Sequence, residues 1–114
     1  MAKLVALMKI RPDISLAAAQ SLYEEEHVPL VMNLMPMIRE YRRNYLARAA
    51  AASTGSPDFD VITELWFENR AGYERMLADH ENPEVSGAIA RDEENCFDRS
   101  KTRFFVVEEA ETAV

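Results

Sequence analysis

Hydrophobic residues occur along this chain in short blocks whose length and spacing predict four β-strands. Residues 3–10 are almost continuously apolar at both odd and even positions, as in a strand that is buried on both faces. Residues 59–67 are rich in β-branched and aromatic side chains, with Glu64 in the middle, and residues 102–108 have a similar character. Residues 37–47 predict a fourth, more polar strand.

Two helical regions separate these strands. The first begins after Ser15, a residue type that caps helix N-termini well. At helical spacing, one narrow stripe of this region holds six side chains: Leu16, Ala19, Tyr23, His27, Leu30 and Leu34. Pro29 removes a backbone donor, so we expect a kink or a break near His27. The second region is predicted as residues 71–78 and 84–95, joined by a loop, and its first piece turns three side chains inward: Tyr73, Met76 and Leu77.

The order β-α-β-β-α-β predicts an α+β fold of the ferredoxin-like type, with a four-stranded antiparallel sheet. Both crossovers are right-handed, so both helical regions should cover the same face of the sheet. The other face would then carry the second set of apolar side chains from three strands. Either these side chains are partly exposed, or a second copy packs on them as a twofold homodimer, which we favour.

Composition narrows the partners and the class of protein. The chain has 114 residues, 48% of them hydrophobic and 29% charged, and a net charge of −7. We expect one domain over residues 1–109, a small polar connection at 49–57 and a frayed tail over 110–114. The acidic balance argues against nucleic acid and anionic membranes as partners, and a single cysteine allows no internal disulfide. We expect a soluble cytoplasmic protein.

Four segments, in this order and spacing, resemble motifs of the EthD-like family. Residues 23–30, Y-E-E-E-H-V-P-L, are similar to its W/Y-x-x-x-H-x-P-L signature, and residues 64–67, E-L-W-F, resemble its strand motif. Residues 92–98, D-E-E-N-C-F-D, and 103–109, R-F-F-V-V-E-E, are similar to the family's C-terminal motifs. The sequence departs from the pattern at Asn95 and Cys96, which precede the expected aromatic residue.

The resemblance implies a dimeric α+β barrel with a small-molecule pocket between the sheet and the helices of each subunit. Relatives with this fold include cofactor-free monooxygenases, an isomerase of muconolactone, and polyketide cyclases or dehydratases. The family is named for a protein encoded with an ether-degrading oxygenase system in bacteria. None of this selects one reaction for the present chain.

Two residues are candidate proton-transfer groups. His27 lies on the predicted inward stripe, one turn after Tyr23, and an imidazole titrates near neutral pH. Its alternative role is a core-edge histidine that binds a carbonyl freed by Pro29. Glu64 lies in an otherwise apolar stretch of strand, where burial would raise the pKa of its carboxyl group. Its alternative role is an ion pair with Arg42 on the neighbouring strand.

Five further residues are candidate ligand-binding groups: Tyr23, Tyr41, Arg42, Asn44 and Trp66. Tyrosine hydroxyls or an amide would polarise a carbonyl or phenolate ligand, and the indole would supply an apolar wall. The alternatives are a solvated edge strand and ordinary core packing. His80 is expected in a polar loop, and acidic neighbours make Cys96 a poor nucleophile.

The sequence favours no metal site and no bound cofactor, because it has neither metal-ligand spacing nor a Gly-rich phosphate loop. We therefore expect a cofactor-independent enzyme of the lyase, isomerase, cyclase or monooxygenase type, acting on a small, mostly apolar oxygenated compound. His27 would be the acid or base, and Glu64, Arg42 and Asn44 would orient the substrate. The alternatives are a non-catalytic small-molecule-binding accessory protein and a dimerisation module without a ligand.

Overall fold

The fold is a four-stranded antiparallel sheet with its helices on one side, as a computed structural model of residues 2–46 and 58–113 describes it. The strands lie in the order β2-β3-β1-β4. Their bounds are β1 (Ala2–Met8), β2 (Ile38–Tyr45), β3 (Val61–Phe67) and β4 (Arg103–Val107). This is the predicted ferredoxin-like α+β fold, and the predicted connection at 49–57 lies outside the described residues.

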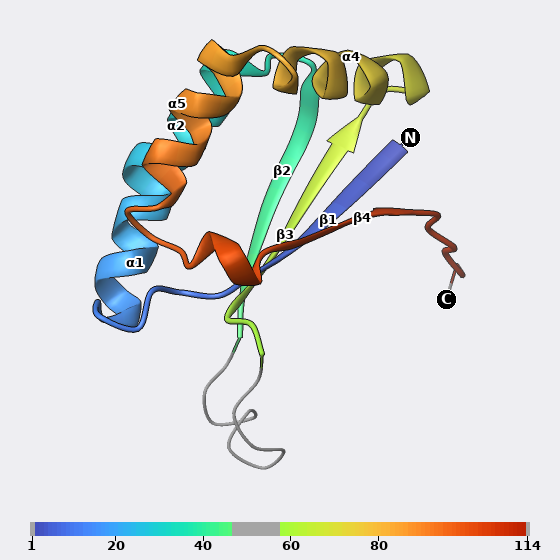
Figure 1. The fold of residues 1–114 in the computed structure, drawn as a ribbon. Coiled ribbons are helices and arrows are strands. Elements are labelled where there is room, and N and C mark those ends of the chain that lie inside the picture. The colour runs from blue at the N-terminus through green and yellow to red at the C-terminus, as the bar shows by residue number, and fades with distance from the viewer. Residues whose placement is uncertain (1, 47–57, 114) are drawn as a thin grey trace.

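The helices form one layer against this sheet, as Figure 1 shows for α1, α2 and α5. Three N-caps follow from local sequence, because Ser15, Asn69 and Asn82 each accept a backbone N–H with the side chain. The helical bounds are α1 (Leu16–Leu22), the π-helix η1 (Tyr23–His27), α2 (Val28–Leu34), α4 (Arg70–His80), α5 (Pro83–Glu93) and the 3₁₀ turn η2 (Arg99–Lys101).

The irregularity predicted near His27 is a π-helical turn within one continuous helical run. Pro29 has no N–H to donate, and the N–H of Val28 reaches back five residues to the carbonyl of Tyr23. The wider turn holds one extra residue, so the buried stripe after His27 moves by one position. Val31 and Met35 are buried there, and the two residues expected from regular spacing, Leu30 and Leu34, are only half-buried.

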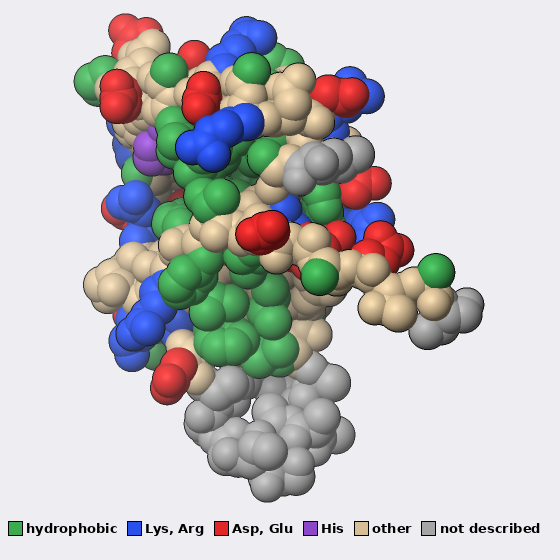
Figure 2. All heavy atoms as spheres, turned by 90° about the vertical axis from the view of Figure 1, so that its right-hand side faces the viewer, with side chains coloured by type: hydrophobic (Ala, Val, Ile, Leu, Met, Phe, Trp, Pro, Cys, Tyr) green, Lys and Arg blue, Asp and Glu red, His purple; other side chains and the backbone are tan. Residues whose placement is uncertain are grey.

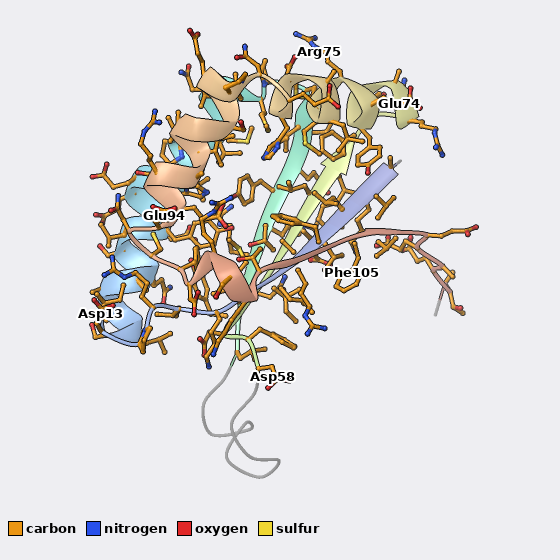
Figure 3. The ribbon with its side chains drawn as sticks, viewed as in Figure 1. Asp13, Asp58, Glu74, Arg75, Glu94 and Phe105 are labelled. Carbon is orange, nitrogen blue, oxygen red and sulfur yellow. The ribbon has the colours of Figure 1, made fainter. Side chains whose placement is uncertain are left out.

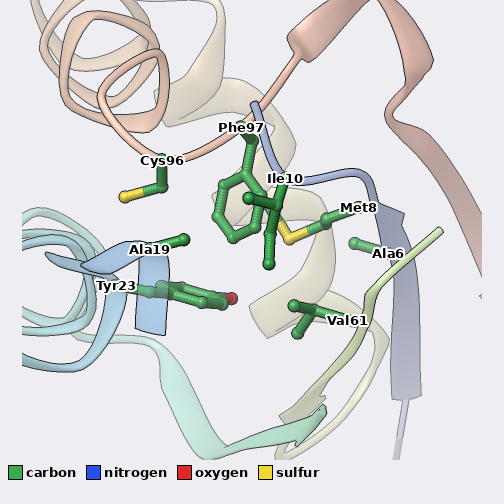
Figure 4. Packing of buried hydrophobic residues seen from close by; sticks show 8 residues of the cluster. All are labelled: Ala6, Met8, Ile10, Ala19, Tyr23, Val61, Cys96 and Phe97. Carbon is green, nitrogen blue, oxygen red and sulfur yellow. The ribbon is translucent and has the colours of Figure 1, made fainter. Parts of the chain in front are cut away.

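The core fills the space between the sheet and the helices in two clusters. One cluster, shown in Figure 4, surrounds Tyr23, which is 1% exposed and packs edge-on against Phe97 at 5.0 Å between ring centroids. The other surrounds Phe67 at the end of β3, which is fully buried and packs against Tyr73 of α4 at 5.9 Å between ring centroids. Leu77, expected to face inward from α4, is 44% exposed instead.

The strand register assigns each side chain to one of the two faces. Ala6 and Thr63 pair on the face that the helices cover, and Val5 and Glu64 pair on the opposite, open face. Arg42 lies directly opposite Glu64 from β2, so it also belongs to the open face. Six apolar residues of β1, β3 and β4 also lie on the open face: Val5, Leu7, Ile62, Trp66, Phe105 and Val107.

Strand β4 leaves large hydrophobic side chains exposed at the edge of the sheet. Phe104, Phe105 and Val106 are 58%, 47% and 57% exposed. Figure 2 shows hydrophobic side chains gathered in a broad area with charged side chains at its margins, and Figure 3 places Phe105 away from the helical layer. No helix in the described part of the chain is long and apolar enough to cross a membrane.

Candidate functional site

A cavity of about 80 Å³ lies between the covered face of the sheet and the helices. An engineered cavity that holds benzene is near 150 Å³, so this one fits only a compound of a few heavy atoms as it stands. Most of its wall is aliphatic, from residues such as Ala6, Val31 and Ile89. Its polar wall consists of six residues: Tyr23, His27, Tyr41, Thr63, His80 and Glu93.

His27 is the last residue of the π-helix and reaches the cavity from the helical layer. Its Nδ1 lies 2.8 Å from Oδ2 of Asp92 on α5, and its side chain is only 3% exposed. Burial lowers the pKa of His27, and the Asp92 carboxylate opposes that shift. The imidazole is therefore held towards its neutral form.

The bond to Asp92 also fixes which nitrogen of the neutral ring carries the proton. A carboxylate only accepts, so Nδ1–H donates to Asp92 and the lone pair lies on Nε2. No hydrogen bond engages Nε2 among residues 2–46 and 58–113. A neutral imidazole oriented by a carboxylate, with Nε2 unengaged, has the form of a general base.

Three hydroxyl groups form a hydrogen-bonded chain on the sheet side of the cavity. The hydroxyl of Thr63 donates to Sδ of Met8 at 3.4 Å, so it accepts from Tyr23. Tyr23 has one proton, which it gives to Thr63, so it accepts in turn from Tyr41 at 3.0 Å. The chain is thus directed from Tyr41 towards Met8. Reversal of this direction would let Tyr41 donate towards a ligand, at the cost of one weak bond from Thr63 to sulfur.

Both tyrosines of this chain remain protonated well beyond neutral pH. Burial raises the pKa of Tyr23 to about 12, and burial also raises the pKa of Tyr41 well above its usual range. Their neutral hydroxyl groups can therefore act as hydrogen-bond donors but not as bases. Tyr23 and His27 lie with ring centroids 5.5 Å apart, so the hydroxyl chain and the imidazole belong to one site.

The π-helix is tied to the edge strand by a second polar cluster outside the cavity. Glu24 accepts from Nε of Arg43 at 2.9 Å and from the hydroxyl of Tyr45. Arg43 in turn donates to the carbonyl of Tyr41 and lies over its ring at 5.1 Å. These bonds hold Tyr41 at the cavity, and they explain why the β2 side chains on this face are half-buried rather than solvated.

Four candidates from the sequence lie on the open face, on the other side of the sheet from His27: Arg42, Asn44, Glu64 and Trp66. They contact one another. Asn44 donates to Glu64 at 3.1 Å. The cationic groups of Lys3 and Arg42 both lie over the Trp66 ring, at 4.5 and 4.9 Å from its centroid. The structure brings His27, Tyr23 and Tyr41 together at the cavity and does not bring these four to it.

Glu64 also differs from expectation in its partner and in its pKa. Its carboxylate pairs with Nζ of Lys3 at 2.8 Å, whereas Arg42 pairs with Glu40. The hydrogen bond from Lys3 lowers the pKa of Glu64, so the expected rise is wrong. The physical reason is that the facing strand β1 supplies a cation, which outweighs the partial burial of the carboxylate.

Three polar wall residues and the partner of His27 were missed from the sequence. Asp92 interrupts an apolar helical stripe and Thr63 an apolar strand, and these interruptions were the available signal. Glu93 adjoins Asp92 and gave no signal of its own. His80 ends α4 rather than lying in a loop, so it reaches the cavity although it is exposed.

Two further observations concern potential metal ligands and the thiol. Among residues 2–46 and 58–113, no group of three or more His, Cys, Asp or Glu is placed to hold a metal ion. Burial raises the pKa of the Cys96 thiol to about 11, and Asp92 and Glu93 add to the rise. The expectation that this thiol is a poor nucleophile agrees with that environment.

The comparisons with known proteins agree with this architecture. A family model described as EthD domain matches residues 11–100. An ethyl tert-butyl ether D (EthD) family protein from Bacillus halodurans C-125 is 19% identical, with a TM-score of 0.69 over 96% of this chain and 99% of that chain. No curated protein sequence matches the chain.

Two further solved structures share the fold at lower identity. A dimeric protein of unknown function and ferredoxin-like fold from Bacteroides fragilis is 11% identical, with a TM-score of 0.59 over 95% of each chain. A hydroxynitrile lyase from Passiflora edulis is 12% identical, with a TM-score of 0.57 over 97% of this chain and 96% of that chain.

Proposed function

This chain belongs to the EthD domain family, and from that premise we propose that it is a cofactor-independent enzyme that moves protons on a small, mostly apolar oxygenated compound. The observation that carries the proposal is the pair formed by His27 and Asp92 at the cavity. His27 is the general base, and Asp92 orients its ring and stabilises the imidazolium that forms when Nε2 takes a proton.

The hydroxyl group of Tyr41 binds the oxygen of the substrate, and Tyr23 supports it from behind. Reversal of the hydroxyl chain turns Tyr41 into a donor at the cavity, where low polarity strengthens its hydrogen bond to an oxygen that gains negative charge. Lyase and isomerase chemistry both need this combination of a base and an oxygen-binding donor. The hydroxynitrile lyase that shares the fold is consistent with lyase chemistry in such a framework.

We also propose that the working unit is a homodimer joined through the open faces of the sheets. The open face carries Val5, Leu7, Ile62 and Phe105, and a second copy would remove this apolar area from water. The neighbour from Bacteroides fragilis is described as dimeric. Phe104 lines the cavity and is 58% exposed, so a copy that extends over β4 would also narrow the entrance to the site.

The test is proton exchange catalysed by the purified dimer. A panel of small neutral alcohols, ethers, ketones and aldehydes is incubated in D₂O, and the loss of carbon-bound protons is followed by NMR. At least one compound should exchange faster than in buffer, and His27→Gln should lower that rate about a hundredfold or more. Met32→Gln introduces the same side chain at an exposed position of α2 and should keep the rate.

Unchanged exchange in folded His27→Gln would remove His27 as the base. Binding of a panel compound to the wild-type protein without any exchange would favour the accessory-protein alternative, in which the same cavity only holds its ligand.

A further inference from the structure

Glu93 is a buried carboxyl group in the wall of the cavity that the proposed base does not use. The residue is 6% exposed, and it lies on α5 next to Asp92. It forms no hydrogen bond or ion pair with any residue among 2–46 and 58–113. An ionised carboxylate buried without a partner is costly, so such a group either binds a proton or binds a ligand.

The surroundings of Glu93 favour the protonated acid. The titratable groups around it come from its own helix and from the elements packed against it: Asp92 on α5, Glu94 at the C-cap, Cys96 after it, Tyr23 and His27 on η1, His80 on α4, Tyr41 on β2 and Arg99 on η2. Burial raises the pKa of Glu93, Glu94 adds to the rise, and only Arg99 opposes it.

The cavity also limits the charge of its ligand. No Lys or Arg lies among the described residues of its wall, and Glu93 and the nearby Asp92 are acidic. A carboxylate or phosphate would meet no cation there, whereas a neutral oxygen would meet hydroxyl groups and an acid. The site therefore suits an uncharged compound with a hydrogen-bond-accepting oxygen.

We propose that Glu93 is the acid of this site, a neutral carboxylic acid that donates to the carbonyl oxygen of a small uncharged ketone or aldehyde while His27 removes the adjacent carbon-bound proton. This inference rests on the proposed function, because it takes His27 as the base. An unengaged acid and an unengaged base on one small cavity form the pair that enolisation requires.

The step balances within the site. Nε2 of His27 takes the proton as the C–H bond breaks, and the bonding pair forms the carbon–carbon double bond. The carbonyl π-electrons move to oxygen, which takes the proton of Glu93. The enol is neutral, His27 is left protonated and Glu93 ionised. Reversal restores the ketone and returns hydrogen to carbon, as deuterium when the solvent is D₂O.

The experiment measures exchange of the α-protons of butan-2-one in D₂O across a range of pH. Glu93→Met removes the donor and should lower the rate about a hundredfold. Glu93→Gln keeps an N–H donor and should lose less, and the fall in rate at high pH that marks ionisation of Glu93 should disappear. Glu84→Gln, exposed at the first turn of the same helix, should match the wild-type profile.

A second measurement reads Glu93 without any substrate. Because its pKa in the folded protein lies above the ordinary 4.5, the folded state holds the proton after the unfolded state has lost it. Wild-type stability must then fall, relative to Glu93→Gln, as pH rises above about 4.5. The urea midpoints of the two proteins should separate progressively over that range.

Three outcomes overturn the inference. Equal separation of the urea midpoints at all pH values means that Glu93 is not held as an acid. An unchanged pH profile in Glu93→Gln, with His27→Gln inactive, rejects the role of Glu93 and leaves the proposed function standing. A wild-type protein that exchanges no proton of any panel compound rejects both.

Discussion

Replacing Asp92 with asparagine isolates what the carboxylate does for His27. The variant keeps the size and the oxygen acceptor, so Nδ1–H can still donate across the present 2.8 Å, but the negative charge is gone. A hydrogen bond to a charged group contributes about 1.5–3 kcal/mol and a neutral one about 0.5–1.5 kcal/mol. The imidazolium formed in the reaction therefore loses about 1–2 kcal/mol.

That loss sets the expected change in rate. Since about 1.4 kcal/mol corresponds to a factor of ten, Asp92→Asn should lower the exchange rate about 5- to 30-fold. The pH profile should shift as well. Burial already lowers the pKa of His27 and Asp92 opposes this, so removing the charge lowers that pKa further. The rise in rate that follows deprotonation of His27 should then begin at lower pH.

The assay is the same proton exchange, with Glu84→Gln as the control, because Glu84 is exposed at the first turn of α5. Glu94, which Figure 3 places at the end of that helix, is not suitable because it acts on Glu93. An unchanged rate in Asp92→Asn, or a shift of the profile to higher pH, would refute the role assigned to the pair. Urea unfolding of both variants separates a loss of catalysis from a loss of folded protein.

Two further predictions concern stability and assembly. Tyr23→Phe leaves Thr63 and Tyr41 without their shared hydrogen-bond partner and should lower the free energy of unfolding in urea by about 1–3 kcal/mol. Tyr73→Phe is the control: its hydroxyl bonds to no described residue, so the loss should stay under about 0.5 kcal/mol. Phe105→Glu should raise the dissociation constant of the dimer about a hundredfold or more in sedimentation equilibrium. A twofold interface buries Phe105 twice, and each buried Phe contributes about 1.5–3 kcal/mol. Leu77→Glu on α4 is the control and should leave the constant unchanged, and equal constants for the two variants would exclude the open face as the interface.

The fold was predictable because the strands and helices each carry a local signal. Short apolar blocks for the strands, the Ser15 cap and Pro29 located the elements to within a few residues. The helical positions that are buried after His27 could not be predicted in the same way. A π-helical turn adds one residue, and Pro29 signals an irregularity without stating its form. Val31 and Met35 consequently replace the expected pair, Leu30 and Leu34, in the core.

The candidate site was predictable only in part. Helical spacing placed Tyr23 and His27 together, and Tyr41 was one of several polar candidates on the predicted strand at 37–47. Asp92 and Glu93 were overlooked because their positions depend on how α5 lies against the π-helix, which no local pattern encodes. His80 was misplaced because α4 runs to residue 80, through the loop expected at 79–83.

The division of polar residues between the two faces follows from the two-residue period of a strand. Neighbours in sequence such as Thr63 and Glu64 lie on opposite faces of the sheet. An acidic side chain in the middle of a strand therefore lies either against the helical layer or on the open face. For Glu64, the paired cation lies on the open face. Lys3 on the open face neutralises Glu64, and the covered face has no Lys or Arg at the described cavity wall. The proposed proton transfer therefore suits the covered face, where His27 and Glu93 form no ion pair with a Lys or Arg of the described cavity wall. In the proposed homodimer, the paired charges of the open face would instead lie against a second copy.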